Sequence, residues 1–482
     1  MKSSEFLPEL IKLKNFRDIE VSGLKIDSRE VNKGDIFFAI RGHKLDGNEF
    51  IKLAFERGAS LVIADTETED TSDVIYFKDL KQHIGIFASR FYGDPSLSLK
   101  TICITGTNGK TTAVETFSGL SNLLGSRCAY MSTVNFSMDG LSLEKASLTT
   151  PDAISIHRNM KNAIHNDAKY LAMEASSHGL EQHRLNGIDI DYAVLTSFSH
   201  DHLDYHGDIN HYKSAKEKLF YDLHPKSNII CIDSSFGRKL YEDLLKINPN
   251  TYSVSIKQKA DFQASFKESP LGIKVNLLAL DQELTFELRT ISKYLASNII
   301  CSMAILSLEG FNNSLLEKYA QDINIPSGRL EKIVKDNLTA YVDYAHTPEA
   351  LRCSLEEIKR IHNEPLWCVF GCGGDRDKEK RPLMGAVAQE YSDHIVITND
   401  NPRTEGEMQI INDILSGMDA QGQFIIEPDR EKAIHFAVAE IKNNSAGGVM
   451  LIAGKGHETY QEIDGNLFEF NDKEIVQSSM GL

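Results

Sequence analysis

Residues 101–112, Thr-Ile-Cys-Ile-Thr-Gly-Thr-Asn-Gly-Lys-Thr-Thr, constrain this chain more than any other segment. The β-branched, apolar run 101–105 predicts a buried parallel strand, and the two glycines that follow allow a tight turn close to a phosphate chain. Lys110 supplies a cation, and Thr111 supplies a hydroxyl for a phosphate-bound magnesium ion. Apolar residues then recur at helical spacing, so the loop opens a helix whose N-terminus favours anions. This order of elements predicts an ATP site.

The loop is a shortened form of the usual phosphate loop. The usual pattern has a glycine five residues before the second loop glycine, and this chain has Ile104 there. A glycine-rich turn that binds no nucleotide is the alternative interpretation. Strand, loop, lysine, hydroxyl and helix in the right order favour the nucleotide. The expected phosphate-binding residues are Gly106, Thr107, Asn108, Gly109, Lys110, Thr111 and Thr112.

Composition is typical of a globular protein of two to four domains. The chain has 482 residues, of which 41% are hydrophobic and 25% charged. No apolar run approaches the roughly 20 residues of a membrane span, and the first ten residues have no sustained apolar core. The seven cysteines lack paired spacing. These features predict a cytoplasmic protein with reduced thiols and no membrane span.

The net charge of −17 argues against nucleic acid as a partner. It also creates a tension, because ATP is itself strongly anionic. Cations must therefore be concentrated locally. The candidates within motifs are Lys110, Arg184, Arg329, Arg376, Arg403 and Lys455.

The pattern along the chain predicts an α/β protein of three domains. Residues 1–97 mix short strands with turns and form a small N-terminal α/β domain. Residues 98–327 alternate strand-like runs, such as 170–173, 192–195 and 228–232, with helical stretches, as in a mostly parallel sheet. From residue 328 to 482 the alternation restarts as a Rossmann-like domain, with strands expected at 340–342, 367–370, 394–398 and 449–453. Thr347 and Pro348 mark a helix start.

The phosphate loop resembles that of the Mur ligases and of their relatives, the folylpolyglutamate synthetases. Further segments resemble Mur ligase motifs over nearly the whole chain and in the right order: 27–29, 34–37, 42–47, 149–152, 174–180, 201–207, 328–331, 343–348, 373–377, 400–403 and 454–458. The chain is therefore identified as a member of this family. The expectations in the next three paragraphs rest on that resemblance.

The resemblance implies a ligase that joins a carboxylate to an amine through an acyl phosphate, with ATP as co-substrate and Mg²⁺ as cofactor. The implied partners are UDP-N-acetylmuramoyl-L-alanyl-D-glutamate and meso-diaminopimelate, in peptidoglycan precursor synthesis by a monomer. A family member that adds L-lysine and a folylpolyglutamate synthetase-like ligase are the near alternatives. An ATP-driven switch or motor with the same kind of loop is a more distant one.

The resemblance also assigns residues to ligands. The N-terminal domain would bind uridine, the central domain ATP, and the C-terminal domain the incoming amino acid. Lys110 and Lys216 are expected to be catalytic. Further ATP contacts are Asn298, Arg329, Asp343 and His346, although Leu295 departs from the usual motif on the adenine side. The muropeptide residues are Ser28, His43, Thr149, Thr150, Ser176, Gln182 and Arg184. The magnesium ligands are Thr111, Glu174, His202 and a carbamylated Lys216.

For the incoming amino acid the resemblance assigns Arg376, Asp400, Asn401, Arg403, Gly454 and Glu458. Diaminopimelate differs from lysine chiefly by a second carboxylate at the far end of its side chain. A planar, two-pronged guanidinium suits that carboxylate, and Arg403 can supply it. The alternative is that Arg403 only caps a loop.

Several of these residues also have interpretations that need no ligand. Glu174 ends a strand and could be merely solvated, and Lys216 lies in a stretch rich in Lys and Glu that is typical of a solvated helix face. The segment 200–206 approaches the His-x-His-x-Asp-His pattern of binuclear zinc hydrolases. Tyr205 stands where that pattern has its last histidine, and His206 comes one residue late. A polar loop that is rich in histidine by chance is the third interpretation of this segment.

Overall fold

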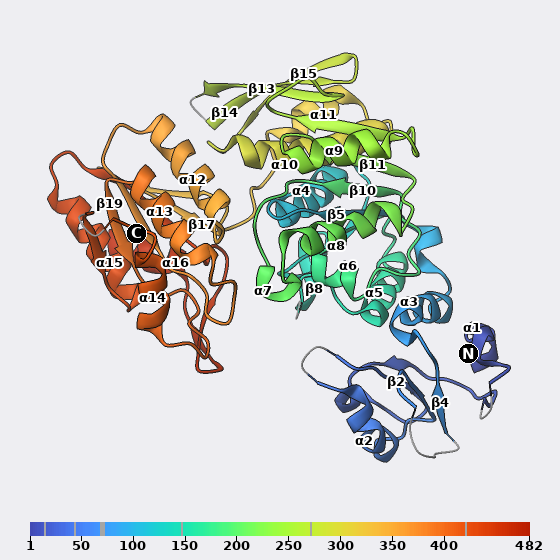
Figure 1. Ribbon diagram of the computed structural model, residues 1–482. Helices are drawn as coiled ribbons and strands as arrows, with labels where there is room; N and C mark the ends of the chain where they lie inside the picture. The colour runs from blue at the N-terminus through green and yellow to red at the C-terminus, as the bar shows by residue number, and fades with distance from the viewer. Residues whose placement is uncertain (14–15, 43–44, 68–72, 146–147, 270–271, 420–421) are drawn as a thin grey trace.

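The computed structural model describes residues 1–13, 16–42, 45–67, 73–145, 148–269, 272–419 and 422–482. Three large sheets follow one another along the described chain, and Figure 1 shows the three units they build. The central unit lies between the N-terminal unit, in blue, and the C-terminal unit, in orange and red. The predicted α/β class with three domains is confirmed. The boundaries at residues 97 and 327 stay a prediction.

The N-terminal sheet has four parallel strands in sequential order: β1 (Leu24–Lys25), β2 (Ile36–Ala39), β3 (Leu61–Ala64) and β4 (Val74–Tyr76). Its helices are α1 (Ser3–Phe6), α2 (Ile51–Glu56) and α3 (Leu80–Phe91). Phe38 and Phe87 pack in a core that also takes in Ile154 of the central unit. This shared core joins the two units through α3 and α5 (Ala153–His165).

The central sheet has eleven strands, and β5 (Lys100–Thr105) lies near its middle, between β10 (Tyr192–Leu195) and β9 (Tyr170–Glu174). Both neighbours are parallel to β5. One side of the sheet continues through β11 (Ser227–Cys231) and β12 (Thr251–Ser255) to the antiparallel strands β13 (Phe262–Ser269), β14 (Gly272–Ala279) and β15 (Gln282–Leu288). The other side ends in β6 (Cys128–Met131), β7 (Asn135–Met138) and β8 (Leu141–Lys145).

Helices cover both faces of this sheet because its strands are apolar on both sides. Ile102 and Ile104 point into one core, with α4 (Lys110–Leu123), α10 (Lys293–Leu308) and α11 (Asn313–Ala320). Cys103 points into the other core, with α5, α8 (Ile209–Tyr221) and α9 (Ser235–Leu244). This alternation along β5 is what a buried parallel strand requires. Two short helices, α6 (Ser177–Glu181) and α7 (Leu203–His206), follow β9 and β10.

The C-terminal sheet has the order β16-β17-β21-β18-β19-β20. The strands are β16 (Glu331–Lys335), β17 (Leu338–Asp343), β18 (Leu366–Phe370), β19 (His394–Ile397), β20 (Phe424–Ile426) and β21 (Gly448–Ala453), and only β16 is antiparallel to its neighbour. One face packs on α12 (Pro348–Ile361), α13 (Lys380–Tyr391) and α14 (Glu407–Leu415), and the other on α15 (Arg430–Asn443) and α16 (Asp472–Met480). A hairpin of β22 (Tyr460–Ile463) and β23 (Asn466–Glu469) follows β21.

Local sequence signals explain several of these boundaries. The Thr347 hydroxyl accepts a hydrogen bond from the Ala350 N–H at 3.2 Å and caps α12, and Pro348 occupies its first turn, as the sequence predicts. The expected strands at 170–173, 192–195, 228–232, 340–342, 367–370, 394–398 and 449–453 all form, with ends that differ by one or two residues. In the described part of the chain, no helix combines the length and the apolarity needed to cross a bilayer.

Candidate active site

A cavity of about 530 Å³ lies between the central and C-terminal units. It opens beyond the carboxyl ends of β5, β9 and β10, which is where ligands bind in open α/β sheets. The C-terminal unit closes its other side. Residues from both units therefore share one space, among them Lys110, Glu174, Lys216, Arg329, His346 and Arg376.

The phosphate loop needs its two glycines. Gly106 has a φ of +155° and Gly109 a φ of +89°, and a Cβ at Gly109 would collide with the Asn298 side chain. The Lys110 Nζ curls back over the loop and donates to the carbonyl oxygens of Gly106 at 2.8 Å and Thr107 at 2.9 Å. Backbone N–H groups, a lysine and a helix N-terminus thus converge at one point, which suits an anionic phosphate chain. Asn298 packs directly against this loop.

An oxygen-rich cluster stands behind the loop. The Thr111 hydroxyl donates to Glu174 Oε1 at 2.8 Å, and the same oxygen accepts the N–H of Thr133 at 2.8 Å. Glu174 is 1% exposed, so the sequence interpretation of a solvated strand end is wrong. A hydroxyl and a buried carboxylate side by side are hard oxygen donors that fit Mg²⁺.

Lys216 lies on the buried face of α8, beneath the phosphate loop. It is 1% exposed, and its Nζ donates to the Gly106 carbonyl at 2.9 Å and lies 4.6 Å from the centre of the Tyr212 ring. Burial, with a smaller contribution from the charge of Lys110, lowers the pKa of Lys216 well below its usual value. The interpretation of Lys216 as part of a solvated face is therefore wrong.

The histidine segment does not build a binuclear zinc site. His206 Nε2 forms a hydrogen bond with Ser177 Oγ at 3.0 Å, and its Nδ1 lies 3.0 Å from Glu181 Oε2. His202 Nε2 instead lies 3.4 Å from Asp201 Oδ2, and both residues line the cavity. Within the described residues, His202 and His206 belong to no metal-sized cluster with His200. The zinc hydrolase alternative is thus not supported by the geometry.

The residues assigned to the muropeptide form a chain of contacts beside Glu174. The Thr150 hydroxyl donates to the Glu174 carbonyl at 2.8 Å and lies 2.9 Å from Ser176 Oγ. Arg184 donates to the Thr150 carbonyl and, at 2.6 Å, to Gln182 Oε1. Thr149 also lines the cavity. Ser28 is buried in a 3₁₀ turn of the N-terminal unit, away from this group, and His43 falls outside the described residues.

Three loops of the C-terminal unit bring the assigned amino-acid residues together. Asn401 donates to Glu458 Oε2 at 2.9 Å. The fully buried Lys455 donates to Asn401 Oδ1 at 3.0 Å and to Glu458 Oε2 at 2.9 Å. A Cβ at Gly454 would collide with Asp400. Arg376 sits on the cavity wall.

Arg403 occupies the end of this network in a left-handed conformation, with a φ of +52°. Its Nε donates to Glu462 Oε2 at 3.0 Å and its Nη1 to the Gly374 carbonyl at 2.8 Å. In the described part of the chain, the second amino group, Nη2, has no hydrogen-bond acceptor. Arg403 thus bonds a loop carbonyl, as the capping alternative expected, while its Nη2 has no acceptor among the described residues.

The sequence interpretation missed three residues that the fold brings to the site. Thr133 bonds Glu174, Asp201 is 3% exposed between His202 and His346, and Glu462 bonds Arg403. Asp201 lies in the segment 201–207, which resembles a Mur ligase motif, so the sequence could have indicated it. Glu462 lies 59 residues beyond Arg403, and no local pattern joins the two.

Comparison with known families decides the membership of the chain. Residues 20–92 match the Mur ligase family catalytic domain, residues 104–306 the Mur ligase middle domain, and residues 328–456 the Mur ligase glutamate ligase domain. The chain belongs to the Mur ligase family. This Mur ligase also resembles individual relatives along nearly their whole length. It is 37% identical to UDP-N-acetylmuramoyl-L-alanyl-D-glutamate–2,6-diaminopimelate ligase of Haemophilus influenzae (strain PittEE), over 99% of each protein.

Further relatives with that name include the Aquifex aeolicus (strain VF5) protein, at 37% identity over 96% of this Mur ligase and 94% of the relative. A solved structure of a ligase with the same name covers 100% of this chain and 99% of that one, with a TM-score of 0.71 and 32% identity. Mycobacterium tuberculosis folylpolyglutamate synthase, complexed with ADP and AMPPCP, shares the fold at a TM-score of 0.64 and 17% identity, over 76% of this chain and 91% of that one.

Proposed function

We propose that this Mur ligase joins meso-diaminopimelate to UDP-N-acetylmuramoyl-L-alanyl-D-glutamate, with conversion of ATP to ADP and phosphate. The observation that carries this proposal is the shared cavity, which the phosphate loop lines from the central unit and Arg376 from the C-terminal unit. Arg403 donates to the carbonyl of Gly374, in the same loop as Arg376. Full-length similarity to ligases of that name supports the same substrates. The solved folylpolyglutamate synthase matches only 76% of the chain, which makes it the weaker parallel.

The reaction needs an activated carboxylate. A carboxylate oxygen of the D-glutamyl residue attacks the γ-phosphorus of ATP, the bond to the bridging oxygen breaks, and an acyl phosphate and ADP form. The amine then attacks the acyl carbon, an amide forms, and phosphate leaves. Negative charge shifts among phosphoryl oxygens in the first step. Lys110 is proposed to stabilise that charge, together with Arg329, whose guanidinium lies 4.6 Å from the Tyr344 ring centre and lines the cavity from the C-terminal unit.

Mg²⁺ is the proposed cofactor, held by Thr111, Glu174, His202 and Lys216. When bound, it neutralises phosphate charge. The contact between the Thr111 hydroxyl and the Glu174 carboxylate fits such an ion, and burial gives Glu174 few competing water molecules. The backbone N–H of Thr133 orients the carboxylate from behind.

Lys216 is proposed to act as a carbamate. A buried lysine with a lowered pKa has its neutral amine available, and that amine can attack CO₂: a C–N bond forms, one amine proton leaves, and an anion results. An ammonium at this position would repel a magnesium ion, whereas a carbamate attracts it. The cation of Lys110, close by, further favours an anion at this position.

The remaining residues are proposed to hold the three substrates: ATP, the muropeptide and diaminopimelate. The Asp343 carboxylate accepts from Ser354 Oγ at 2.6 Å, and it lines the ATP cavity with His346. Hydroxyls of Thr149, Thr150 and Ser176, with Arg184, suit the muropeptide arm. Asn401, Arg403 and Glu458 suit the far end of diaminopimelate, whose carboxylate and ammonium match a guanidinium and a carboxylate.

One chain supplies all these residues, so we propose a monomer. ATP and UDP-linked precursors are cytoplasmic metabolites, which is the basis for proposing that compartment.

A substrate-omission series tests this proposal. Phosphate release is measured with ATP alone, then with UDP-N-acetylmuramoyl-dipeptide added, then with diaminopimelate as well. The expected result is near silence until all three are present. Steady ATP turnover without muropeptide would instead indicate an ATP-driven switch or motor. Amide formation with a folate and glutamate would indicate a folylpolyglutamate synthetase-like ligase.

A further inference from the structure

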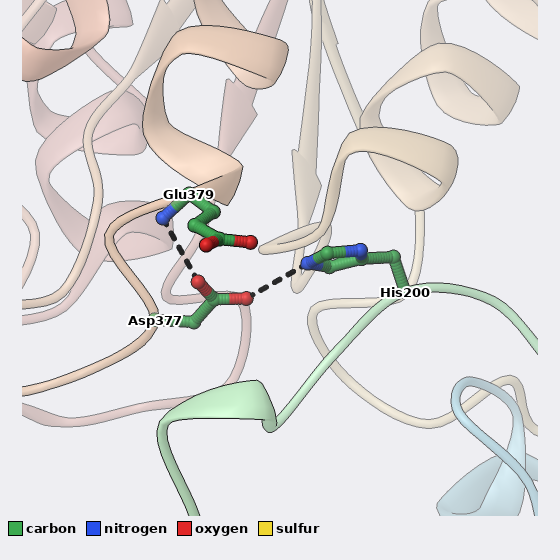
Figure 2. A group of neighbouring side chains, drawn as sticks. All are labelled: His200, Asp377 and Glu379. Carbon is green, nitrogen blue, oxygen red and sulfur yellow. Dashed lines mark hydrogen bonds and ion pairs between the residues drawn. The ribbon is translucent and has the colours of Figure 1, made fainter. Parts of the chain in front are cut away.

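His200, Asp377 and Glu379 meet where the central unit touches the C-terminal unit (Figure 2). His200 lies in the segment after β10, and the two acidic residues lie between β18 and α13. His200 Nε2 is 3.0 Å from Asp377 Oδ2. Figure 2 shows the Glu379 carboxylate next to Asp377 and pointing toward the His200 imidazole. One ligand atom of each residue lies within 4.8 Å of the other two.

The charges in this cluster are not balanced. Asp377 is 5% exposed; its Oδ1 accepts the Glu379 N–H at 2.9 Å, which aims Oδ2 at His200. Among the described residues, no Lys or Arg nitrogen lies within 4.0 Å of the carboxylate oxygens of Asp377 or Glu379. The cluster therefore offers two carboxylates and one partly exposed imidazole nitrogen, with no Lys or Arg in direct contact among the described residues. A divalent cation between the three groups would be attracted by both carboxylates.

We propose that His200, Asp377 and Glu379 bind one divalent transition-metal ion of the zinc class. The imidazole Nε2 and one oxygen from each carboxylate are the ligands. One nitrogen and two oxygens are typical of Zn²⁺ and its first-row neighbours, whereas Mg²⁺ is bound mostly through oxygens. Binding requires His200 to carry its proton on Nδ1, so the ion replaces the His200–Asp377 hydrogen bond. Glu379 is exposed and can adjust to the ion.

This site would link the two units, because neither unit contains all three ligands. The ion would therefore bind tightly only when the units are together, and it would favour the closed cavity. Zn²⁺ at this position should slow turnover wherever the cleft must open to release products. The proposal does not depend on which amino acid the enzyme adds. It is also distinct from the proposed magnesium site, which uses Thr111, Glu174, His202 and Lys216.

Equilibrium dialysis of the chelator-treated full chain with ZnCl₂, under excess Mg²⁺, tests the site, with bound zinc measured by elemental analysis. The expected result is one strongly bound zinc ion per chain, and affinity that falls about 10- to 100-fold or more in His200→Ala and in Glu379→Gln. His211→Ala is the matched control, because His211 Nδ1 lies 2.7 Å from Asp208 Oδ2 in an exposed pair that gains no third ligand from the described residues. Equal zinc affinity in wild type and His200→Ala would overturn the proposal.

Activity separates this proposal from the proposed function. With Mg²⁺ alone, His200→Ala and Glu379→Gln should remain ligases. Added Zn²⁺ should slow the wild type more than either variant. Zinc inhibition that is equal in all three proteins would place the ion at the phosphate site and refute the inter-unit site. If the wild type itself shows no ligase activity, the proposed function is refuted, but the dialysis result for the zinc site still stands.

Discussion

The phosphate loop, which lines the cavity, and the loops assigned to the incoming amino acid, of which Arg376 lines it, are built in opposite ways. The phosphate loop belongs to one continuous segment, residues 100–123, in which the strand β5, the two glycines, the lysine and the helix α4 follow one another. The amino-acid site is assembled from three loops after β18, β19 and β21, joined by side chains such as Lys455 and Glu462. The first site is fixed by local geometry and the second by long-range contacts. Ligand specificity should therefore be easier to change in the C-terminal unit than ATP use in the central unit.

The largest expected effect tests the continuous site. Lys216→Ala removes the proposed carbamate beneath the phosphate loop, and the rate of phosphate release with all substrates should fall by roughly 10³-fold, as for loss of a preorganised charged group. A short carboxylate such as acetate should restore part of the rate. Lys213→Ala is the control on the same helix, since Lys213 is only partly buried and its Nζ pairs with Glu217 Oε1 at 3.8 Å. Full activity of Lys216→Ala would rule out the proposed role.

The next effect tests how the distributed site is held. Arg430 is fully buried and donates to Asp472 at 2.7 Å, and also to the carbonyls of Asn399 and Ala453, which directly precede two amino-acid loops. Asp472→Asn leaves this guanidinium without its counter-ion, and the free energy of unfolding should fall by about 3–5 kcal/mol. Urea denaturation measures it. Lys432→Ala breaks an exposed pair and should change stability by less than about 1 kcal/mol. Equal effects of the two changes would contradict the account.

Arg403→Ala tests the ligand side of the distributed site. Losing a charge-assisted contact to the far carboxylate of diaminopimelate should weaken its binding by about 2–5 kcal/mol. The KM for diaminopimelate should rise by orders of magnitude, while ATP and UDP-sugar binding, measured by calorimetry, should stay nearly unchanged. Arg403→Lys keeps the charge but not the two-pronged geometry, so it should recover only part of the loss. An unchanged KM for diaminopimelate would leave Arg403 as a loop cap.

The smallest effect concerns Glu462, which orients Arg403 through its Nε. Glu462→Gln keeps the shape and one acceptor oxygen but removes the charge. We expect a loss of about 1–2 kcal/mol in diaminopimelate binding, less than for Arg403→Ala, since a hydrogen bond to a charged group becomes a neutral one. Steady-state kinetics with both amino acids should show a lower preference for diaminopimelate over lysine. A double variant whose loss equals that of Arg403→Ala alone would show that Glu462 acts through Arg403. Additive losses would show that it does not.

The sequence predicted the local features and missed the long-range ones. The run 101–105 reads as a buried strand, and Thr347 with Pro348 reads as a helix start, because each signal lies within a few residues of its effect. The antiparallel strands from Phe262 to Leu288 were missed, although buried residues alternate strictly along β14. The burial of Lys216 could not be read from its neighbours, because it depends on how α8 docks under a distant loop. The Arg403–Glu462 pair likewise depends on a hairpin that folds back onto the loop.

The most direct test of the central claim is a competition between amino acids. The wild-type enzyme receives ATP, UDP-N-acetylmuramoyl-L-alanyl-D-glutamate, and equal concentrations of meso-diaminopimelate and L-lysine, and mass spectrometry identifies the product. The account predicts that the diaminopimelate adduct dominates, because Arg403 keeps one amino group for a far-end carboxylate that lysine lacks. A product mixture dominated by the lysine adduct would contradict it.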